Sequence, residues 1–172
     1  ITPGISLLNP GPLYHNAPFI LSHAALFAGG RVTGMVKFDA EETLRLIEKS
    51  RVEWVNFVPT MMHRIWALPE SVRSRYDLSS LKIVFHMAAP MPPWLKEKWI
   101  EWLGPERIYV LYGGTEAQGA TIISGVEWLE HPGSVGLFLQ GAQGDVNSCV
   151  VHKPEADSML ALDVIAGRYA RA

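Results

Sequence analysis

The amino-acid sequence predicts an α/β fold in which a mostly parallel β-sheet is flanked by helices. Short runs of β-branched and apolar residues alternate with helix-like segments several times at short spacing. Such alternation favours βαβ crossovers, which place helices on the faces of a parallel sheet. Glycines and prolines mark the segment boundaries, and no internal repeat or low-complexity tract is present. The composition, 48% hydrophobic and 19% charged, excludes a disordered tail.

Length and charge narrow the class of protein further. A chain of 172 residues is long enough for one globular domain with a real core. The formal net charge of −2 gives no basic excess of the kind that binds nucleic acid or an anionic membrane. The single cysteine, Cys149, excludes an internal disulfide and a cysteine-rich zinc site, which predicts a reducing, cytoplasmic compartment. No apolar run reaches the ~18 residues that a transmembrane helix needs.

The first part of the chain supplies the start of the predicted sheet. We expect a strand over 5–8, a helix over 20–28 and a strand over 31–36. Gly29 and Gly30 end the helix, because glycine adopts the left-handed conformation of a helix stop cheaply. Asp39 opens the next helix as its N-cap, and Glu42 stands three residues further on, as in a capping box.

The middle of the chain continues the alternation. We expect strands over 54–58, 81–87, 108–112 and 120–124, helices over 61–68 and 92–103, and a polar connection over 69–80. Trp94, Trp99 and Trp102 fall on one apolar face of the later helix. This spacing indicates a packing surface rather than a cofactor site.

The segments that follow strands carry the candidate site, because ligands of an open parallel sheet bind at the carboxyl ends of its strands. The most informative segment consists of Tyr112, Gly113, Gly114, Thr115 and Glu116. Its glycines let the backbone approach a ligand closely, and its tyrosine ring offers a flat face for a base. The threonine hydroxyl suits a phosphate oxygen, and the carboxylate suits Mg²⁺. Taken alone, a glycine turn with a polar tip is the commoner explanation of such a composition.

Two further segments lie near expected strand ends or helix starts. Ala88, Ala89 and Pro90 are small enough to leave room for a flat ligand, or they form a plain link between a strand and a helix. His15 lies in a loop, where it could bind a ligand, move a proton or act only as a structural hydrogen-bonding group. We expect structural roles for the other histidines, although His86 lies near any site at its strand end. No zinc-ligand spacing and no Gly-x-Ser-x-Gly motif is present.

Several short segments occur in an order that is typical of one enzyme family. They are Pro-Leu-Tyr-His-Asn at 12–16, Val-Pro-Thr at 58–60, Leu-Ser-Ser-Leu-Lys at 78–82, Ala-Ala-Pro at 88–90, Tyr-Gly-Gly-Thr-Glu at 112–116 and His-Pro-Gly-Ser-Val-Gly at 131–136. The chain thereby resembles the AMP-forming acyl-CoA synthetases, and over 86–104 it is most similar to the fatty-acid and bile-acid ligases. The resemblance runs from about residue 11 to residue 136. It implies one lobe of the large domain of the adenylating enzymes.

This resemblance implies an ATP-dependent ligase that activates a carboxylic acid in two steps. The carboxylate attacks the α-phosphate of ATP to give an acyl-adenylate and pyrophosphate, and the thiol of coenzyme A then displaces AMP to form a thioester. The implied catalytic residues are Thr115, which would contact the AMP phosphate, Glu116, which would hold Mg²⁺ against the ATP phosphates, and His15, which would lie beside the reacting carboxylate. Such groups stabilise the charge that develops on phosphate oxygens.

The resemblance also implies the binding residues. Tyr112 would stack on adenine, and residues 88–90 would form the adenine slot. Gly113 and Gly114 would border the acyl tunnel, where any side chain would obstruct the substrate. The implied partners are therefore a small-molecule carboxylate and a nucleotide, with no nucleic acid.

Parts of the family's catalytic apparatus do not match this sequence. The phosphate-binding loop that ends in lysine belongs before residue 1, and the mobile C-terminal domain with its catalytic lysine belongs beyond the end of the resemblance. We therefore expect residues 1–136 to be a fragment of an AMP-binding domain, residues 137–172 to be an unassigned tail and the isolated chain to be inactive. The start at Ile1 rather than at a methionine also predicts a piece of a longer protein.

Two alternatives stay open. One is a non-catalytic α/β remnant or assembly module with at most weak nucleotide binding, and the other is an unrelated nucleotide-binding domain that carries Gly-Gly-Thr-Glu by chance. Convergence of Thr115, Glu116 and residues 88–90 on one cleft separates the ligase from the second alternative. A fragment with exposed sheet edges and apolar surface is also open to self-association.

Overall fold

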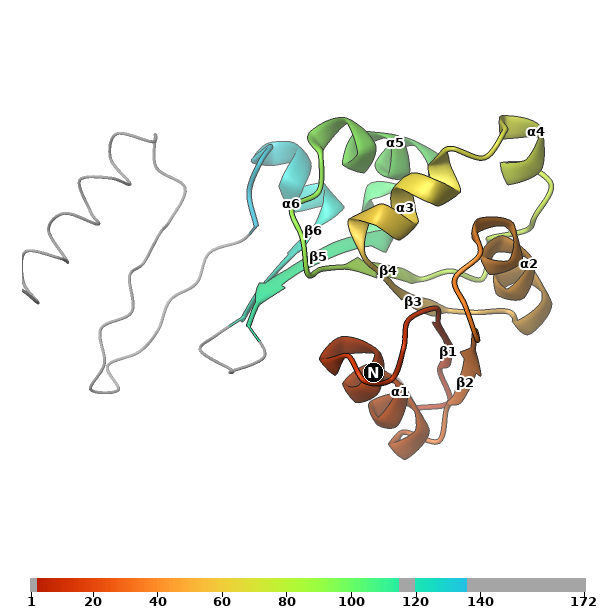
Figure 1. Ribbon diagram of the computed structural model, residues 1–172. Helices are drawn as coiled ribbons and strands as arrows, with labels where there is room; N and C mark the ends of the chain where they lie inside the picture. The colour runs from red at the N-terminus through yellow and green to blue at the C-terminus, as the bar shows by residue number, and fades with distance from the viewer. Residues whose placement is uncertain (1–2, 115–119, 136–172) are drawn as a thin grey trace, which may run out of the picture.

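A single sheet with helices on both faces organises the chain (Figure 1), as the sequence predicts. The computed structural model describes residues 3–114 and 120–135. The strands are β1 (Ser6–Asn9), β2 (Arg31–Gly34), β3 (Trp54–Phe57), β4 (Ile83–His86), β5 (Ile108–Gly113) and β6 (Ala120–Ser124). The helices are α1 (Asn16–Phe27), α2 (Ala40–Ser50), α3 (Pro59–Trp66), α4 (Glu70–Arg73), α5 (Pro93–Leu103) and α6 (Gly125–Glu130), with the 3-10 turn η1 (Pro105–Arg107) before β5.

The strand order places two neighbouring strand ends where a ligand can bind. The order is β2-β1-β3-β4-β5-β6, with parallel pairing from β2 through β5 and an antiparallel β6 at the edge. The chain first crosses from β1 to β2 on one side, and β3 then pairs on the other side of β1. Such a reversal opens a crevice at the carboxyl ends of β1 and β3, because the following connections leave in opposite directions.

The two faces of the sheet carry cores of unequal size. A large cluster, which includes Leu44, Phe57 and Trp99, joins the sheet to α2, α3 and α5. A smaller cluster, which includes Leu7, Ala25 and Trp54, lies under α1 on the opposite face. Figure 1 shows α1 on one side of the sheet, with α3 and α5 on the other. Because β1 and β3 are buried along their whole length, the centre of the sheet lies between these two cores.

Local signals at the helix ends explain most of the boundaries. The Asp39 side chain accepts a hydrogen bond from the Glu42 amide at 2.8 Å, which confirms the predicted N-cap of α2. Helix α1 begins at Asn16, earlier than predicted, because Pro18 is tolerated in a first turn. Helix α6, which the sequence reasoning missed, begins at a capping box formed by Ser124 and Glu127.

The tryptophan face predicted on α5 needs one correction. Trp99 is buried, and Trp102 is partly buried against the large cluster. Trp94 is instead 47% exposed, and its ring meets the ring of His63 edge-on at a centroid distance of 5.8 Å. The reason is the helical spacing: Trp94 stands five residues before Trp99, about 140° away around the helix, whereas the buried Leu95 stands four residues before it.

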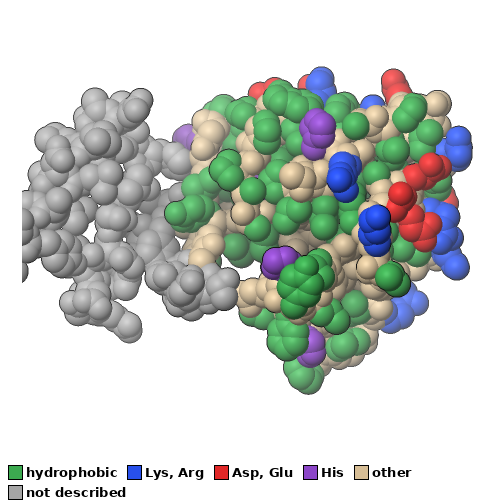
Figure 2. All heavy atoms as spheres, viewed as in Figure 1, with side chains coloured by type: hydrophobic (Ala, Val, Ile, Leu, Met, Phe, Trp, Pro, Cys, Tyr) green, Lys and Arg blue, Asp and Glu red, His purple; other side chains and the backbone are tan. Residues whose placement is uncertain are grey.

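The surface has a charged region and an apolar region. Figure 2 shows acidic and basic side chains gathered over α2 and α4, while hydrophobic side chains cover the region around α1. The ion pairs at the charged side join Glu42 to Arg45, Asp77 to Arg51 and Glu41 to Arg75. In α1, Phe19, Ile20, Leu26 and Phe27 are exposed. Among the described residues, no helix combines the length and the apolar character that a membrane span requires.

Candidate functional site

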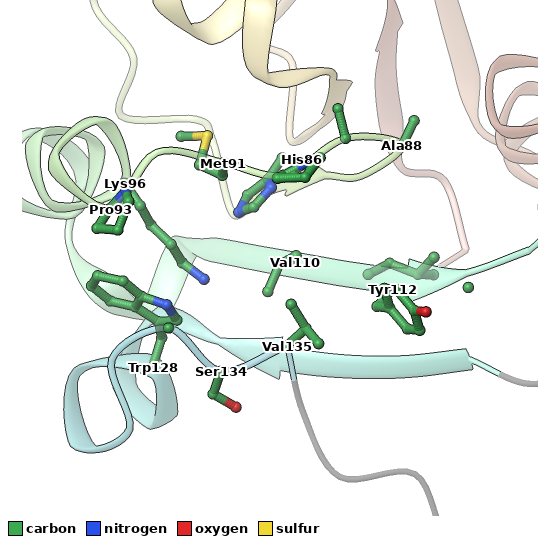
Figure 3. A pocket seen from close by; sticks show the side chains of 15 residues that line it. His86, Ala88, Met91, Pro93, Lys96, Val110, Tyr112, Trp128, Ser134 and Val135 are labelled. Carbon is green, nitrogen blue, oxygen red and sulfur yellow. The ribbon is translucent and has the colours of Figure 1, made fainter. Parts of the chain in front are cut away.

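Two cavities lie side by side at the carboxyl ends of the central strands. The first, which we call the slot, has a volume of about 410 Å³ (Figure 3). One of its walls is the link between β4 and α5, with Ala88, Ala89 and Pro90. Tyr112 and Gly113 from the end of β5 form the facing wall. The structure thus brings together two segments that the sequence singled out separately.

The inner end of the slot is lined by His86, Lys96, Val110 and Trp128. Lys96 is 2% exposed and His86 is 1% exposed, although both carry polar side chains. The Lys96 ammonium lies 4.9 Å from the centre of the Trp128 ring, in a cation–π contact. In Figure 3 the side chains of His86, Lys96 and Trp128 converge from β4, α5 and α6 on this end of the cavity.

Burial sets the charge of these two groups. Burial lowers the pKa of His86 to about 3, and the nearby positive charge of Lys96 acts in the same direction. Burial also lowers the pKa of Lys96 to about 8. At neutral pH the slot therefore contains a neutral imidazole next to a mainly protonated amine.

The free energy of unfolding should depend on pH because His86 is buried. The folded pKa of about 3 lies below the ordinary value of 6.5, so the unfolded chain binds a proton first as the pH falls. The free energy of unfolding should therefore decrease between pH 6.5 and about 5, above the range in which carboxyl groups titrate. Urea unfolding across this window measures the slope, which should be shallower in His86→Leu than in the wild type. Equal slopes in wild type and His86→Leu would contradict the assignment.

The second cavity, which we call the side cavity, has a volume of about 730 Å³ and lies at the crevice between β1 and β3. Its lining is mainly apolar and includes Pro12, Ile20, Val58, Met61 and Met87. His15, Gly113 and Gly114 also line it. Asn56 adds one buried polar group to the lining. Its side-chain oxygen has no hydrogen-bond partner within the described part of the chain.

The slot and the side cavity share a wall formed by Ala88, Leu111 and Gly113. Ala88 has a φ of +73°, in the left-handed region that residues with a Cβ seldom occupy. Local strain of this kind persists only where the surrounding structure holds it, and it concentrates at ligand sites. Ala88, whose side chain is a single methyl group, therefore lies in the wall that the two cavities share.

The structure places most of the predicted site residues at the two cavities. Residues 88–90 line the slot with Tyr112, His15 and Gly114 line the side cavity, and Ala88 and Gly113 border both. Thr115 and Glu116 lie outside the described residues, so their convergence with the slot stays a prediction. Among the described residues, no group of three or more possible metal ligands is present.

Sequence reasoning identifies the polar groups of these cavities only in part. It places His86 near any site at its strand end but gives it a structural role, and it does not single out Lys96 or Asn56. Lys96 could have been recognised from its spacing, because it precedes the buried Trp99 and Ile100 by three and four residues on the same helix face. Asn56 could have been recognised as an amide within an otherwise apolar strand.

The sequence of the chain matches a known protein family. The sequence model of the family described as AMP-binding enzyme matches residues 2–149, most of the chain. The chain belongs to this AMP-binding enzyme family. The resemblance inferred from the short motifs is therefore confirmed at the level of the family.

Curated members of the AMP-binding enzyme family include acyl-CoA ligases similar to this chain. Acyl-CoA ligase AKT1 of Alternaria alternata is 32% identical over 136 residues, which cover 78% of this chain and 23% of the relative. Medium/long-chain-fatty-acid–CoA ligase FadD8 of Mycobacterium tuberculosis is 34% identical over 101 residues, which cover 55% of this chain and 17% of the relative. The chain thus spans less than a quarter of the length of either relative.

Solved structures of other proteins share the fold. The amide bond synthetase McbA of Marinactinospora thermotolerans superposes with a TM-score of 0.65 at 27% identity, over 73% of this chain and 24% of that one. The N-terminal domain of FACL13 from Mycobacterium tuberculosis gives a TM-score of 0.70 at 24% identity, over 86% of this chain and 38% of that one. The second likeness is one of fold: a mostly parallel sheet flanked by helices.

Proposed function

We propose that this chain is the nucleotide- and acid-binding part of an ATP-dependent acyl-CoA ligase. The observation that carries the proposal is the pair of cavities that meet at Ala88. A flat slot between residues 88–90 and Tyr112 suits an adenine base, and the adjoining apolar cavity suits the hydrocarbon part of a carboxylic acid. Membership of the AMP-binding enzyme family supports the same activity.

The proposed reaction joins the contents of the two cavities. A carboxylate oxygen bonds to the α-phosphorus of ATP, the bond to the β-phosphate oxygen breaks, and pyrophosphate leaves. The thiol of coenzyme A then loses its proton and bonds to the acyl carbon, and AMP leaves with the electron pair of the broken C–O bond. Because the slot and the side cavity share the wall at Ala88 and Gly113, the acid and the nucleotide can meet there.

The proposed roles of the remaining residues follow the family motif. His15 lines the side cavity, where it would orient the carboxylate. Thr115 would contact the nucleotide phosphate, and Glu116 would be the ligand of Mg²⁺. The carboxylate of Glu116 provides the hard oxygen ligands that this cation prefers.

Binding of AMP to the purified 172-residue chain tests the proposal. We expect isothermal titration calorimetry to show AMP binding, and Tyr112→Ala to weaken it by about tenfold or more through the loss of stacking on the base. Tyr14→Ala is the matched control, because Tyr14 is also exposed but does not line the slot. We also expect no carboxylate-dependent exchange between ATP and pyrophosphate by the isolated chain. Failure of the wild type to bind AMP would rule out the proposed nucleotide site.

A further inference from the structure

The inner end of the slot holds two polar groups whose burial the fold alone does not explain. Both ring nitrogens of His86 are buried and have no hydrogen-bond partner within the described residues. Leaving such groups unsatisfied is destabilising, and most buried polar atoms in proteins are paired. His86 lines the slot, so a molecule in the slot can supply the missing partner.

Lys96 gives the same end of the slot a positive charge without a compensating carboxylate. Among the described residues that line the slot, Lys96 is the sole lysine or arginine, and no aspartate or glutamate occurs. The Trp128 ring stabilises the ammonium through its face, but a ring face leaves other N–H donors of the lysine available. Figure 3 shows the Lys96 side chain directed from α5 into the slot, beside Val110.

We infer that Lys96 and His86 form a base-reading pair, which hydrogen-bonds to the nitrogen-bearing edge of a purine in the slot. This inference rests on the proposed function and extends it to the residues that recognise the base. The adenine edge presents a ring-nitrogen acceptor next to an amino donor. Lys96 donates to the ring nitrogen, and the neutral His86 imidazole accepts from the amino group.

The position of the pair favours the base over the phosphates as its partner. Lys96 lies at the apolar inner end with Val110 and Trp128, whereas the backbone of Gly113 lies at the carboxyl end of β5. A flat heterocycle buries its faces in such an apolar slot and needs hydrogen bonds along its edge. Phosphates instead gain from backbone amides and solvent at the mouth of a site.

Binding of adenosine and AMP to the full 172-residue chain tests the inference. Lys96→Met keeps an unbranched side chain, one atom shorter than that of lysine, and removes its donors. We expect it to weaken both ligands by about the same factor, roughly ten- to a hundredfold, the loss of a hydrogen bond to a charged group. Lys98→Met is the matched control, because the Lys98 side chain on the same helix is 45% exposed and pairs with Glu101. Circular dichroism and thermal unfolding check that each variant is folded.

A second measurement needs no substitution. Deaza-adenosines, in which one ring nitrogen is replaced by C–H, keep the shape of the base but lose one acceptor. We expect the wild-type chain to bind one of the 1-, 3- and 7-deaza compounds about tenfold or more weakly than adenosine. Equal binding of all three would overturn the inference.

The outcomes separate this inference from the proposed function. If Lys96→Met weakens the binding of AMP but not that of adenosine, Lys96 binds the phosphate and the assignment of the base-reading pair is wrong. If Lys96→Met binds both ligands as the wild type does, the pair is again wrong, while the nucleotide site stands. If the wild type binds neither ligand, the proposed function fails and the inference fails with it.

Discussion

Replacing Ala88 by valine is expected to abolish nucleotide binding, with a loss of affinity of about a hundredfold or more. Two effects combine at this position. Ala88 has a φ of +73°, where a β-branched side chain is more strained than alanine. The added methyl groups also enlarge a residue that lines both the slot and the side cavity. Calorimetric titration with AMP measures the loss.

A glycine at the same position is the control for this prediction. Ala88→Gly relieves the left-handed strain and adds no atoms to either cavity, so we expect AMP affinity to be retained and thermal stability to be equal or higher. The valine variant must also unfold cooperatively for its loss of binding to be interpreted. Wild-type affinity in a folded Ala88→Val chain would show that this wall does not border the nucleotide.

Replacing Trp99 by alanine is expected to destabilise the fold by about 3–5 kcal/mol. Trp99 is 1% exposed and packs between Phe57 and Trp102, at ring-centroid distances of 5.8 Å and 5.1 Å. Its indole nitrogen donates a hydrogen bond to the Met62 carbonyl at 3.3 Å, which links α5 to α3. Truncation therefore leaves a large cavity in the larger core and removes this link between α5 and α3.

Trp94 on the same helix provides the comparison. Trp94→Ala removes the same number of atoms from a side chain that is 47% exposed, so we expect a loss below about 1 kcal/mol. Chemical denaturation by urea, followed by circular dichroism, measures both variants. Similar losses in the two variants would contradict the burial that the structure assigns to Trp99.

The parallel part of the sheet could be predicted because its strands carry unambiguous local signals. The segment around Trp54 is β-branched and aromatic, and Pro59 follows it. The pair Asp39 and Glu42 likewise predicts the start of α2, and the structure shows Asp39 as its N-cap. Helix α6 was not predicted, because it is short and follows directly on β6. The strand pattern of β6 runs up to the residue at which the helix begins.

The candidate site could be predicted only in pieces. Residues 88–90 and Tyr112 stood out by composition, but their approach depends on the pairing of β4 with β5, in which His86 is opposite Val110. Register between distant strands is set by the whole core and leaves no local signature. Lys96 was overlooked because a lysine on a helix is normally solvated, and only packing against Trp128 shows where its amine lies.

The unequal cores on the two faces of the sheet have a consequence for how the side cavity opens. Among the described residues, helix α1 packs against the smaller cluster and not the larger one, and several of its apolar side chains are exposed. A unit with few buried contacts separates from a fold at a lower free energy than the elements of the main core. Since α1 forms one wall of the side cavity, its excursions would open that cavity while the slot on the larger core keeps its shape. The two cavities would then differ in mechanical character: one compliant, one stiff.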